Sequence, residues 1–374
     1  MKTRVAFLIR RLDRGGAERQ LIELARGLNK GRFDVTIVTF YGGGDFASAI
    51  TPESGINVVC LDKGGRWDIL GFLSRLIRTT RRLRPHIVHG YMSVANELSV
   101  IAGRACSARV VWGLRASDLN PVPQSLTDRW LFRAGALLSC LADRIIVNSQ
   151  CGRSFHAAEG YCEERLTVIA NGIDTQRFSI SPEQRKAVRR QWSVDDEEIL
   201  IGRAARLDPT KDYPSFLKAA AHVSLVQPNA KFACIGDGTD CAQLHQIAKA
   251  EGVANRMIWA GGCADMPAVY NALEICVSSS VSEGFPNSVA EPMSCGTPCV
   301  ATDVGDSALI VGDAGVIVPA RNPDAIADGI LRLITNYGQY PRERVRRRIT
   351  DNFTTERLVA RTEAEFEKLL LSLS

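Results

Sequence analysis

Short apolar runs alternate with amphipathic helical segments along nearly the whole chain. Most runs are rich in β-branched residues and apolar on both faces, which is typical of parallel strands covered by helices on both sides. The segments between them, such as residues 18–28 and 213–226, supply the crossovers. The runs occupy residues 5–9, 35–40, 56–61, 87–91, 110–113, 144–148 and 166–170, and then 199–203, 231–236, 257–260, 275–278, 298–302 and 316–319. This alternation predicts an α/β protein with two doubly wound parallel sheets.

A polar interval at residues 174–196 separates the two groups of runs. A chain of 374 residues is long enough for about two domains. We therefore expect one Rossmann-like domain over residues 1–175 and a second over residues 190–350. Ligands bind beyond the carboxyl ends of the strands in such sheets, so facing sheets would share one site in the cleft between the domains.

Composition narrows the class of protein. An apolar content of 45% with 23% charged residues is ordinary for a soluble globular protein. No apolar run approaches the ~20 residues that cross a bilayer, and the amino terminus lacks a signal-peptide pattern, so we expect a cytoplasmic protein. The 11 cysteines form no CxxC pairs, which favours reduced thiols over disulfides and gives no support for a metal site.

An acidic glycine-rich stretch follows the expected strand at residues 274–279. Glu283 and Glu291 bracket a glycine turn and the start of a short helix, with Pro286 suited to the first helical position and Gly296 to the position after the helix end. Free N–H groups at a helix start attract anions, and carboxylates accept hydrogen bonds from sugar hydroxyls. The stretch therefore predicts either a sugar-phosphate site or a capped surface helix with two solvated acids.

Two further loops follow strands of the second predicted sheet. The first carries Arg206 and Lys211. The planar guanidinium of the arginine suits a diphosphate by bidentate hydrogen bonds, and the lysine ammonium suits it by charge. The second carries Gly236 and Gly238, but it lacks the third glycine and the later acid of a dinucleotide fingerprint, which disfavours a dehydrogenase. Since all three loops leave the same end of one sheet, we expect them to form one donor site.

In the first half, Gly15 and Gly16 lie between a strand and a helix. Paired glycines allow a donor phosphate or an acceptor to approach the backbone closely, although a glycine turn before a helix is also commonplace.

Arginines gather in two places although the net charge is only +5. They are either solvated helix faces or surfaces that attract an anionic membrane or a lipid-linked acceptor. Nucleic acid is disfavoured as a partner because no aromatic residues interleave with the basic ones. The two clusters are Arg75, Arg78, Arg81, Arg82 and Arg84, and Arg342, Arg344, Arg346, Arg347 and Arg348.

These features together resemble the retaining glycosyltransferases of family 4, which have the GT-B fold of two facing Rossmann-like domains. The resemblance spans nearly the whole chain, and its most specific part is the Glu283 and Glu291 pair. The other matching segments are Gly15-Gly16-Ala17-Glu18, Pro85-His86-Ile87-Val88-His89, Asn171-Gly172-Ile173-Asp174, Arg206-Leu207 with Lys211, and Gly284-Phe285-Pro286-Asn287.

The resemblance implies a nucleotide-diphosphate sugar held mainly by the second domain, with no cofactor and no metal. Arg206 and Lys211 would neutralise the leaving diphosphate, and Glu291 would bind the ribose. Glu283 and Gly284 would hold the sugar and phosphate together with the backbone amides of Phe285, Pro286 and Asn287. The segment 351–374 would be a helix that packs back on the first domain.

One position departs from the family pattern. Many members carry a histidine where this chain has Arg115, with Asp118 nearby. An arginine cannot act as a base at neutral pH, so Arg115 would stabilise charge or orient substrate. His89 and Asn96 are alternative polar residues lining the site, and His89 is also interpretable as a hydrogen-bonded histidine at a strand end.

The sequence thus predicts a retaining, metal-independent glycosyltransferase. It would move a sugar from a nucleotide-diphosphate donor to a glycan or polyprenyl-linked acceptor in surface polysaccharide biosynthesis, peripherally at the inner face of the cytoplasmic membrane. The alternative is a catalytically silent nucleotide-sugar-binding scaffold subunit. The presence of all four charged residues (Arg206, Lys211, Glu283 and Glu291) favours the enzyme. An epimerase or phosphorylase is disfavoured because no lysine-anchored cofactor motif is found.

Overall fold

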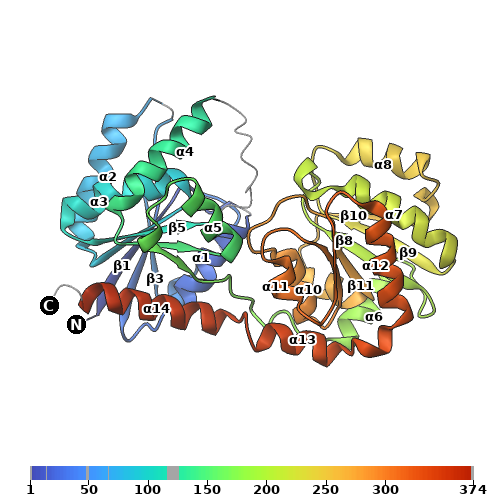
Figure 1. Ribbon diagram of the computed structural model, residues 1–374. Helices are drawn as coiled ribbons and strands as arrows, with labels where there is room; N and C mark the ends of the chain where they lie inside the picture. Colours follow the sequence, from blue (N-terminus) through green and yellow to red (C-terminus); the bar gives the residue numbers. More distant parts are fainter. Residues whose placement is uncertain (1, 14, 48–49, 66, 116–125, 372–374) are drawn as a thin grey trace. The chain divides into compact units, whose positions relative to one another are not determined.

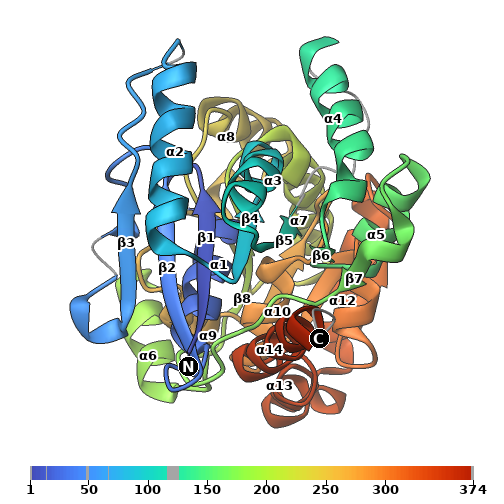
Figure 2. The ribbon, with the colours of Figure 1, turned by 90° about the vertical axis from the view of Figure 1, so that its left-hand side faces the viewer.

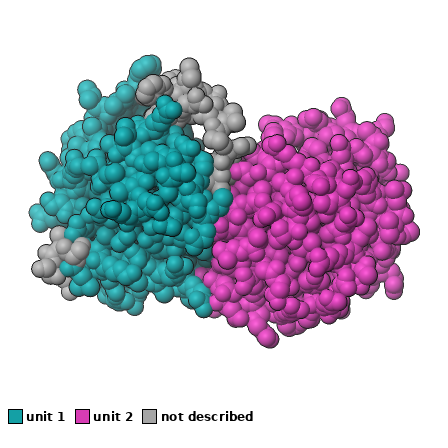
Figure 3. Space-filling model, viewed as in Figure 1, with its two compact units in different colours: residues 1–172, 355–374 teal, residues 173–354 magenta. Residues whose placement is uncertain are grey.

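The computed structural model describes residues 2–13, 15–47, 50–65, 67–115 and 126–371. They form two compact units (Figure 3), one of residues 1–172 with 355–374 and one of residues 173–354. Each unit contains one parallel sheet with helices on both faces (Figure 1).

The first sheet has seven strands in the order β3-β2-β1-β4-β5-β6-β7. In chain order they are β1 (Thr3–Ile9), β2 (Phe33–Thr39), β3 (Ile56–Cys60), β4 (Ile87–Tyr91), β5 (Arg109–Leu114), β6 (Arg144–Val147) and β7 (Leu166–Val168). The helices of this unit are α1 (Gly16–Gly27), α2 (Ile69–Leu83), α3 (Ser93–Cys106), α4 (Leu126–Leu138), α5 (Gln150–Ala158) and α14 (Thr355–Leu371).

The second sheet has six strands in the order β10-β9-β8-β11-β12-β13. They are β8 (Ile199–Ala204), β9 (Ala230–Ile235), β10 (Met257–Gly261), β11 (Ile275–Ser278), β12 (Cys299–Thr302) and β13 (Val316–Val318). The helices are α6 (Pro182–Gln191), α7 (Tyr213–Val226), α8 (Cys241–Ala250), α9 (Met266–Ala272), α10 (Asn287–Ser294), α11 (Ser307–Val311), α12 (Pro323–Thr335) and α13 (Arg342–Thr350). Every strand predicted from the sequence is present, which confirms the α/β fold with two Rossmann-like domains.

Alternating residues of β1 explain why its run is apolar on both faces. Phe7 and Ile9 join a core with residues of α1 and α14, whereas Leu8 joins a separate core with Phe72 and Leu76 of α2. Successive side chains of a strand point to opposite faces, so a strand covered by helices on both sides must be apolar throughout.

The carboxyl-terminal helix α14 belongs to the first unit, where it runs beside α1 (Figures 1 and 2). The helices are so close that a Cβ on Gly27 would lie 2.4 Å from Cγ2 of Val359. The Glu363 carboxylate also accepts a hydrogen bond of 2.8 Å from the backbone N–H of Asn29. A glycine on α1 therefore permits this close packing.

The polar interval at residues 174–196 belongs to the second unit. It contains α6, and the chain passes into the second unit before it, at residue 173. The charges of α6 are used inside this unit: Arg185 and Arg189 both form ion pairs with Glu274. These charges therefore pair with a residue that is distant in the sequence, which composition alone does not reveal.

The second arginine cluster also has a structural role. Arg342, Arg346 and Arg348 donate hydrogen bonds to main-chain carbonyls, including those of Leu273, Cys295, Ser294, Phe178 and Ile310. Buried carbonyls at helix and strand ends need such partners. These three side chains are therefore committed to the fold rather than to an anionic surface.

None of the helices within the described residues combines the length and apolarity needed to cross a bilayer. All 11 cysteines are free thiols.

His89 is fully buried among the rings of Phe7, Tyr91 and Phe366. Neither ring nitrogen has a hydrogen-bond partner within the described structure, so the interpretation as a hydrogen-bonded histidine is wrong. Burial, together with the charge of Arg115, holds the pKa of His89 well below its usual value of 6.5. This histidine is therefore neutral in the folded protein at neutral pH.

We predict that His89 makes the protein less stable in mild acid. Below pH 6.5 the unfolded chain takes up a proton that the folded chain excludes, so the free energy of unfolding falls by up to about 1.4 kcal/mol per pH unit. Urea unfolding from pH 8 to pH 5 should show a shallower decline for His89→Leu than for wild type. Some slope should remain because the pKa values of His86 and His156 are also lowered. Parallel curves for the two proteins would contradict the prediction.

Candidate functional site

The site predicted from the acidic loop lies at the carboxyl ends of β8 and β11. These strands are neighbours at the point where the strand order of the second sheet reverses. In doubly wound sheets, this reversal opens a crevice outside the strand ends where ligands bind. The loop after β8 carries Arg206 and Lys211, and the loop after β11 carries Glu283. The topology therefore brings together residues that lie more than 70 positions apart.

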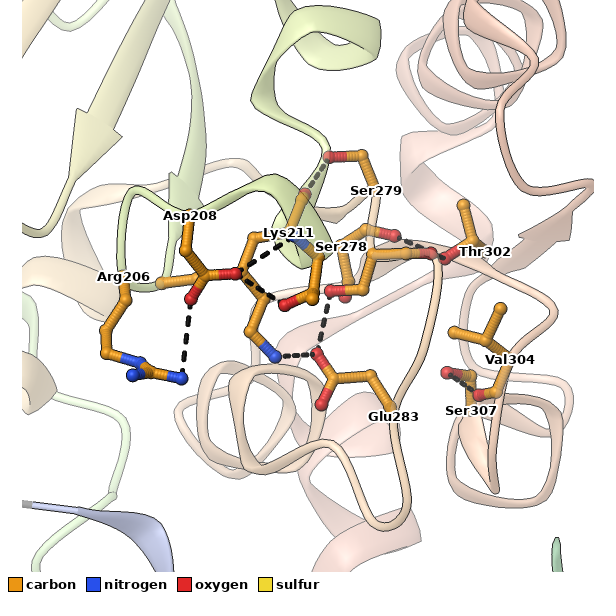
Figure 4. A network of polar contacts seen from close by, with 12 residues as sticks. Arg206, Asp208, Lys211, Ser278, Ser279, Glu283, Thr302, Val304 and Ser307 are labelled. Carbon is orange, nitrogen blue, oxygen red and sulfur yellow. Dashed lines mark hydrogen bonds and ion pairs between the residues drawn. The ribbon is translucent and has the colours of Figure 1, made fainter. Parts of the chain in front are cut away.

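Lys211 and Glu283 form an ion pair in this crevice (Figure 4). The lysine Nζ lies 2.7 Å from Oε1 of Glu283, and the side chains are 13% and 8% exposed. The same Oε1 accepts a 2.7 Å hydrogen bond from the Ser280 hydroxyl. Within the described residues, Oε2 accepts no hydrogen bond, and Nζ has no second partner. The pair can thus offer an acceptor to a hydroxyl group and donors to an anionic oxygen.

Arg206 extends from the same loop as Lys211, on the same side of the network (Figure 4). Its side chain is 79% exposed, and its guanidinium lies 3.4 Å from the Asp208 carboxylate. Asp208 in turn accepts a hydrogen bond from the backbone of Thr210, at the start of the short 3-10 helix Pro209–Lys211. Arg206 is therefore a largely exposed cation at the edge of the crevice, whereas Lys211 is mostly buried and held by its ion pair with Glu283.

Arg203 is a site residue that the sequence reasoning missed. It is fully buried at the end of β8 and donates hydrogen bonds of 2.8 Å to the Lys211 carbonyl and to the Ser280 hydroxyl. Its guanidinium also lies over the Tyr213 ring, 5.4 Å from the centroid. Arg203 thus positions both partners of the Glu283 side chain. The available signal was a charged residue inside an otherwise apolar strand, where burial demands partners.

Glu291 lies outside this network, although it is also buried. It projects from α10 and accepts a hydrogen bond of 3.3 Å from the Tyr270 hydroxyl. Its predicted role in ribose binding stays a prediction. The helix begins one residue later than expected, at Asn287, with Pro286 as its N-cap. It ends as predicted, with Gly296 at a φ of +78° and N–H bonds from Gly296 and Thr297 that close the last turn.

The turn between Glu283 and α10 is stabilised by packing and hydrogen bonds with neighbouring segments of the second unit. Phe285 is 5% exposed and packs edge-to-face on Phe353, with ring centroids 5.5 Å apart. The Gly284 carbonyl accepts a hydrogen bond from Asp306, and a Cβ on Gly305 would lie 2.4 Å from that carbonyl. Of the predicted phosphate-binding residues, Pro286 has no N–H to donate, so only backbone groups beside it can serve.

Gly236 and Gly238 are explained by packing against the loop that carries Arg206. A Cβ on Gly236 would lie 2.0 Å from the Ala205 carbonyl oxygen, and one on Gly238 would lie 2.1 Å from that of Leu207. Gly236 also has a φ of +135°, which favours glycine. The predicted contact of these glycines with the donor substrate stays a prediction. The close packing already explains why both positions are glycine.

In the first unit, Gly15 and Gly16 begin α1 as predicted. The Glu18 carboxylate folds back over them, so that a Cβ on Gly15 would lie 2.1 Å from Glu18 Oε2. Burial, opposed by a backbone hydrogen bond, raises the pKa of Glu18. A carboxylate here favours hydroxyl groups over phosphate as partners of Gly16.

Arg115 is 8% exposed and already has partners. It donates hydrogen bonds to Oδ1 of Asn171 at 2.8 Å and to the Tyr91 hydroxyl at 3.1 Å. Asp118 lies outside the described residues. Asn96 pairs with the backbone of Gly113 through both its amide oxygen and its nitrogen. Asn96 and His89 are both buried, and their suggested place in the lining of a site stays a prediction.

Comparison with known proteins gives family matches for both halves of the chain. Residues 14–177 match the model of the Glycosyltransferase Family 4 family, and residues 198–336 match that of Glycosyl transferases group 1. A D-inositol 3-phosphate glycosyltransferase of Geodermatophilus obscurus is 24% identical over 355 residues, covering 85% of this chain and 77% of the relative. The UDP-Gal:alpha-D-GlcNAc-diphosphoundecaprenol alpha-1,3-galactosyltransferase of Escherichia coli is 22% identical, covering 70% of this chain and 69% of the relative.

The fold is also similar to a solved structure, that of Anabaena Alr3699/HepE in complex with UDP. The TM-score is 0.86 at 23% identity, over 98% of this chain and 100% of that one. The same protein with UDP-glucose gives a TM-score of 0.85 at 22% identity, over 98% and 99% of the two chains.

We predict that Lys211 and Glu283 are energetically coupled. Lys211→Met or Glu283→Gln alone should lower the free energy of unfolding by about 3 kcal/mol, because each leaves a poorly solvated charge unpaired, and the double variant should lose less than the sum. Urea unfolding of the four proteins measures the coupling. The more exposed pair Lys231 and Glu198 is the control, expected to couple by less than about 1 kcal/mol. Additive losses at Lys211 and Glu283 would contradict the prediction.

Proposed function

Because the chain belongs to the glycosyltransferases of family 4, we propose that it transfers a sugar, with retention of configuration, from a nucleotide-diphosphate donor to a glycan or polyprenyl-linked acceptor. The observation that carries the proposal is the Lys211 and Glu283 pair at the β8 and β11 ends, with Oε2 and Nζ still open to a ligand. In this assignment Glu283 accepts a hydrogen bond from a donor-sugar hydroxyl, and Lys211 contacts the diphosphate.

The chemistry gives each cation a role. Breaking the glycosyl–phosphate bond develops negative charge on the diphosphate and positive charge on the sugar. Lys211 is fixed beforehand by Arg203 and Glu283, so it stabilises the first charge without reorganising. Arg206 adds a flexible second cation at the rim. With two cations supplied by the chain, we propose that no metal is required.

Retention is proposed through front-face attack, in which the donor phosphate takes the proton of the acceptor hydroxyl. Glu291 is assigned to the ribose, and the amides of Phe285 and Asn287 to the phosphate or sugar. Arg115, held by Asn171 and Tyr91, would orient substrate or stabilise charge rather than act as a base.

The relatives support the substrate classes. The Anabaena protein was solved with UDP and with UDP-glucose, so a uridine nucleotide is the first donor class to examine. The name of the Escherichia coli relative specifies a diphosphoundecaprenol-linked acceptor. A comparable lipid-linked acceptor would place this protein in surface polysaccharide biosynthesis.

The exposed residues of helix α2 support the proposal that the protein acts at the inner face of the cytoplasmic membrane. Trp67, Ile69 and Leu70 at its start are 86%, 60% and 83% exposed. Arg78 and Arg82 are exposed further along the same helix. Exposed apolar side chains beside arginines are typical of segments that bind the interface of anionic bilayers.

We predict that one nucleotide sugar stabilises the protein and is turned over. At 100 times its dissociation constant the donor should raise the free energy of unfolding by about 2.7 kcal/mol in a thermal-shift screen. In the presence of acceptor, the nucleotide diphosphate should be released at a rate unaffected by EDTA, and NMR of the product should show the donor's anomeric configuration. Glu283→Gln should lower kcat by about 100-fold, since it removes a preorganised charge beside the reacting sugar.

Glu251→Gln, a surface change on the same domain, is the matched control and should leave turnover intact. Arg115→Ala belongs in the same assay, and turnover close to wild type would remove Arg115 from the mechanism. Tight donor binding without turnover for any acceptor would instead support the silent scaffold subunit.

We predict binding to vesicles that contain phosphatidylglycerol but not to vesicles of phosphatidylcholine alone. Each basic residue near an anionic surface contributes about 1 kcal/mol, so R78Q/R82Q should weaken binding by about 30-fold in co-sedimentation. The control R190Q/R332Q removes the same charge from exposed sites of the second unit. Equal non-binding to both vesicle types would refute the membrane assignment.

A further inference from the structure

A hollow of about 410 Å³ lies at the amino-end edge of the first sheet. Its lining includes Arg4, Arg81, Arg84, His86, Ser107 and Leu370. Arg4 is the second residue of β1, His86 directly precedes β4, and Ser107 lies just before β5. Ligands of doubly wound sheets bind at the opposite, carboxyl edge. This hollow is therefore separate from any site of sugar transfer.

The charge of the hollow is strongly positive. Three guanidinium groups line it, and none of its lining residues is acidic. The carboxyl ends of α2 and α3 also lie here, and each helix dipole contributes about half a negative charge. Together the two helix dipoles offset the charge of only one of the three arginines. Asp34 is the register partner of Arg4, but no ion pair joins these two residues.

Two of the arginines are held in place by the main chain. Arg4 Nε donates a hydrogen bond of 2.7 Å to the Arg84 carbonyl, and Arg81 Nε donates one of 3.3 Å to the Ala105 carbonyl. Across the described part of the chain, no partner is found for the terminal Nη groups of Arg4, Arg81 or Arg84. The backbone contacts therefore fix the guanidinium groups of Arg4 and Arg81 through Nε and leave their Nη groups available to bind an anion.

His86 adds a neutral donor to this wall. Its Nδ1 accepts a hydrogen bond of 2.9 Å from the backbone N–H of Arg4, so the neutral ring carries its proton on Nε2. Burial, and then the Arg4 charge, lower the pKa of His86. A dianion bound beside the ring would act in the opposite direction and raise this pKa.

We propose that this hollow binds a phosphate group through Arg4, Arg81 and Arg84. Guanidinium forks match the oxygens of a phosphate bidentately. A second hollow, of about 490 Å³, shares Arg81 and continues along α2 past Ile77, Leu73 and Leu70. Its apolar stripe follows the three-to-four-residue spacing of one helix face. The phosphate therefore belongs either to a lipid headgroup, with a chain on the α2 stripe, or to a free phosphate compound.

Titration with two probes distinguishes the sources. Inorganic phosphate represents the free compound, and dihexanoyl phosphatidic acid below its micelle concentration represents the lipid. NMR of the histidine rings at low salt should show the His86 signal moving saturably and its pKa rising on binding. Tighter binding of the phosphatidic acid assigns a lipid headgroup, and equal or tighter binding of inorganic phosphate assigns a free compound.

Paired variants locate the binding. R81Q/R84Q should weaken binding of the preferred probe at least tenfold. The matched control R26Q/R104Q removes the same charge from the last turns of α1 and α3, outside the hollow, and should bind like wild type. Circular dichroism verifies that both variants fold. Absence of saturable binding, an unmoved His86 signal, or equal weakening by the two variants would overturn the proposal. Since no sugar transfer is measured, the outcome is independent of the proposed function.

Discussion

The geometry of the candidate site depends on the buried guanidinium of Arg203. An unpaired charge in a protein interior costs several kcal/mol, so this side chain must collect acceptors wherever the chain can supply them. It finds them in the Lys211 carbonyl and the Ser280 hydroxyl, which belong to the loops after β8 and β11. Through these two hydrogen bonds, Arg203 fixes those two loops to each other. Lys211 and Glu283 then meet at 2.7 Å as a consequence.

Close backbone packing reinforces these loops. Gly236 and Gly238 let one loop lie directly against the carbonyls of residues 205 and 207, and Gly305 does the same for the turn at Glu283. A side chain at any of the three positions would force the loops apart. Electrostatic stabilisation is most effective when its groups are fixed before the charge develops, so glycines that contact no ligand still contribute to the site. The loops are glycine-rich here because they are tightly packed.

Features set by local sequence pattern could be predicted from the sequence, whereas features set by tertiary partners could not. The strands, the end of α10 at Gly296 and the meeting of Lys211 with Glu283 follow from periodicity, capping chemistry and the topology of doubly wound sheets. Arg203 was missed because its partner Ser280 lies 77 positions away, and the pairing of the α6 arginines with Glu274 is equally invisible to local pattern. His89 was expected to have a hydrogen-bond partner because a polar side chain at a strand end usually finds one. No periodicity reveals that aromatic rings surround it instead.

The two arginine clusters show the same limit and explain why only one of them is open to a partner. Both follow a helical spacing, and composition does not distinguish them. Arg342, Arg346 and Arg348 lie beside carbonyls left without partners where α9, α10 and α11 end, so their guanidiniums turn inward. At the end of α2, the backbone N–H of Arg84 already satisfies the Thr80 carbonyl in a left-handed cap. Arg75 is held by Asp68 and by the carbonyls of Leu61 and Asp62. Arg78 and Arg82 of the same helix are exposed, where an anionic partner can supply acceptors.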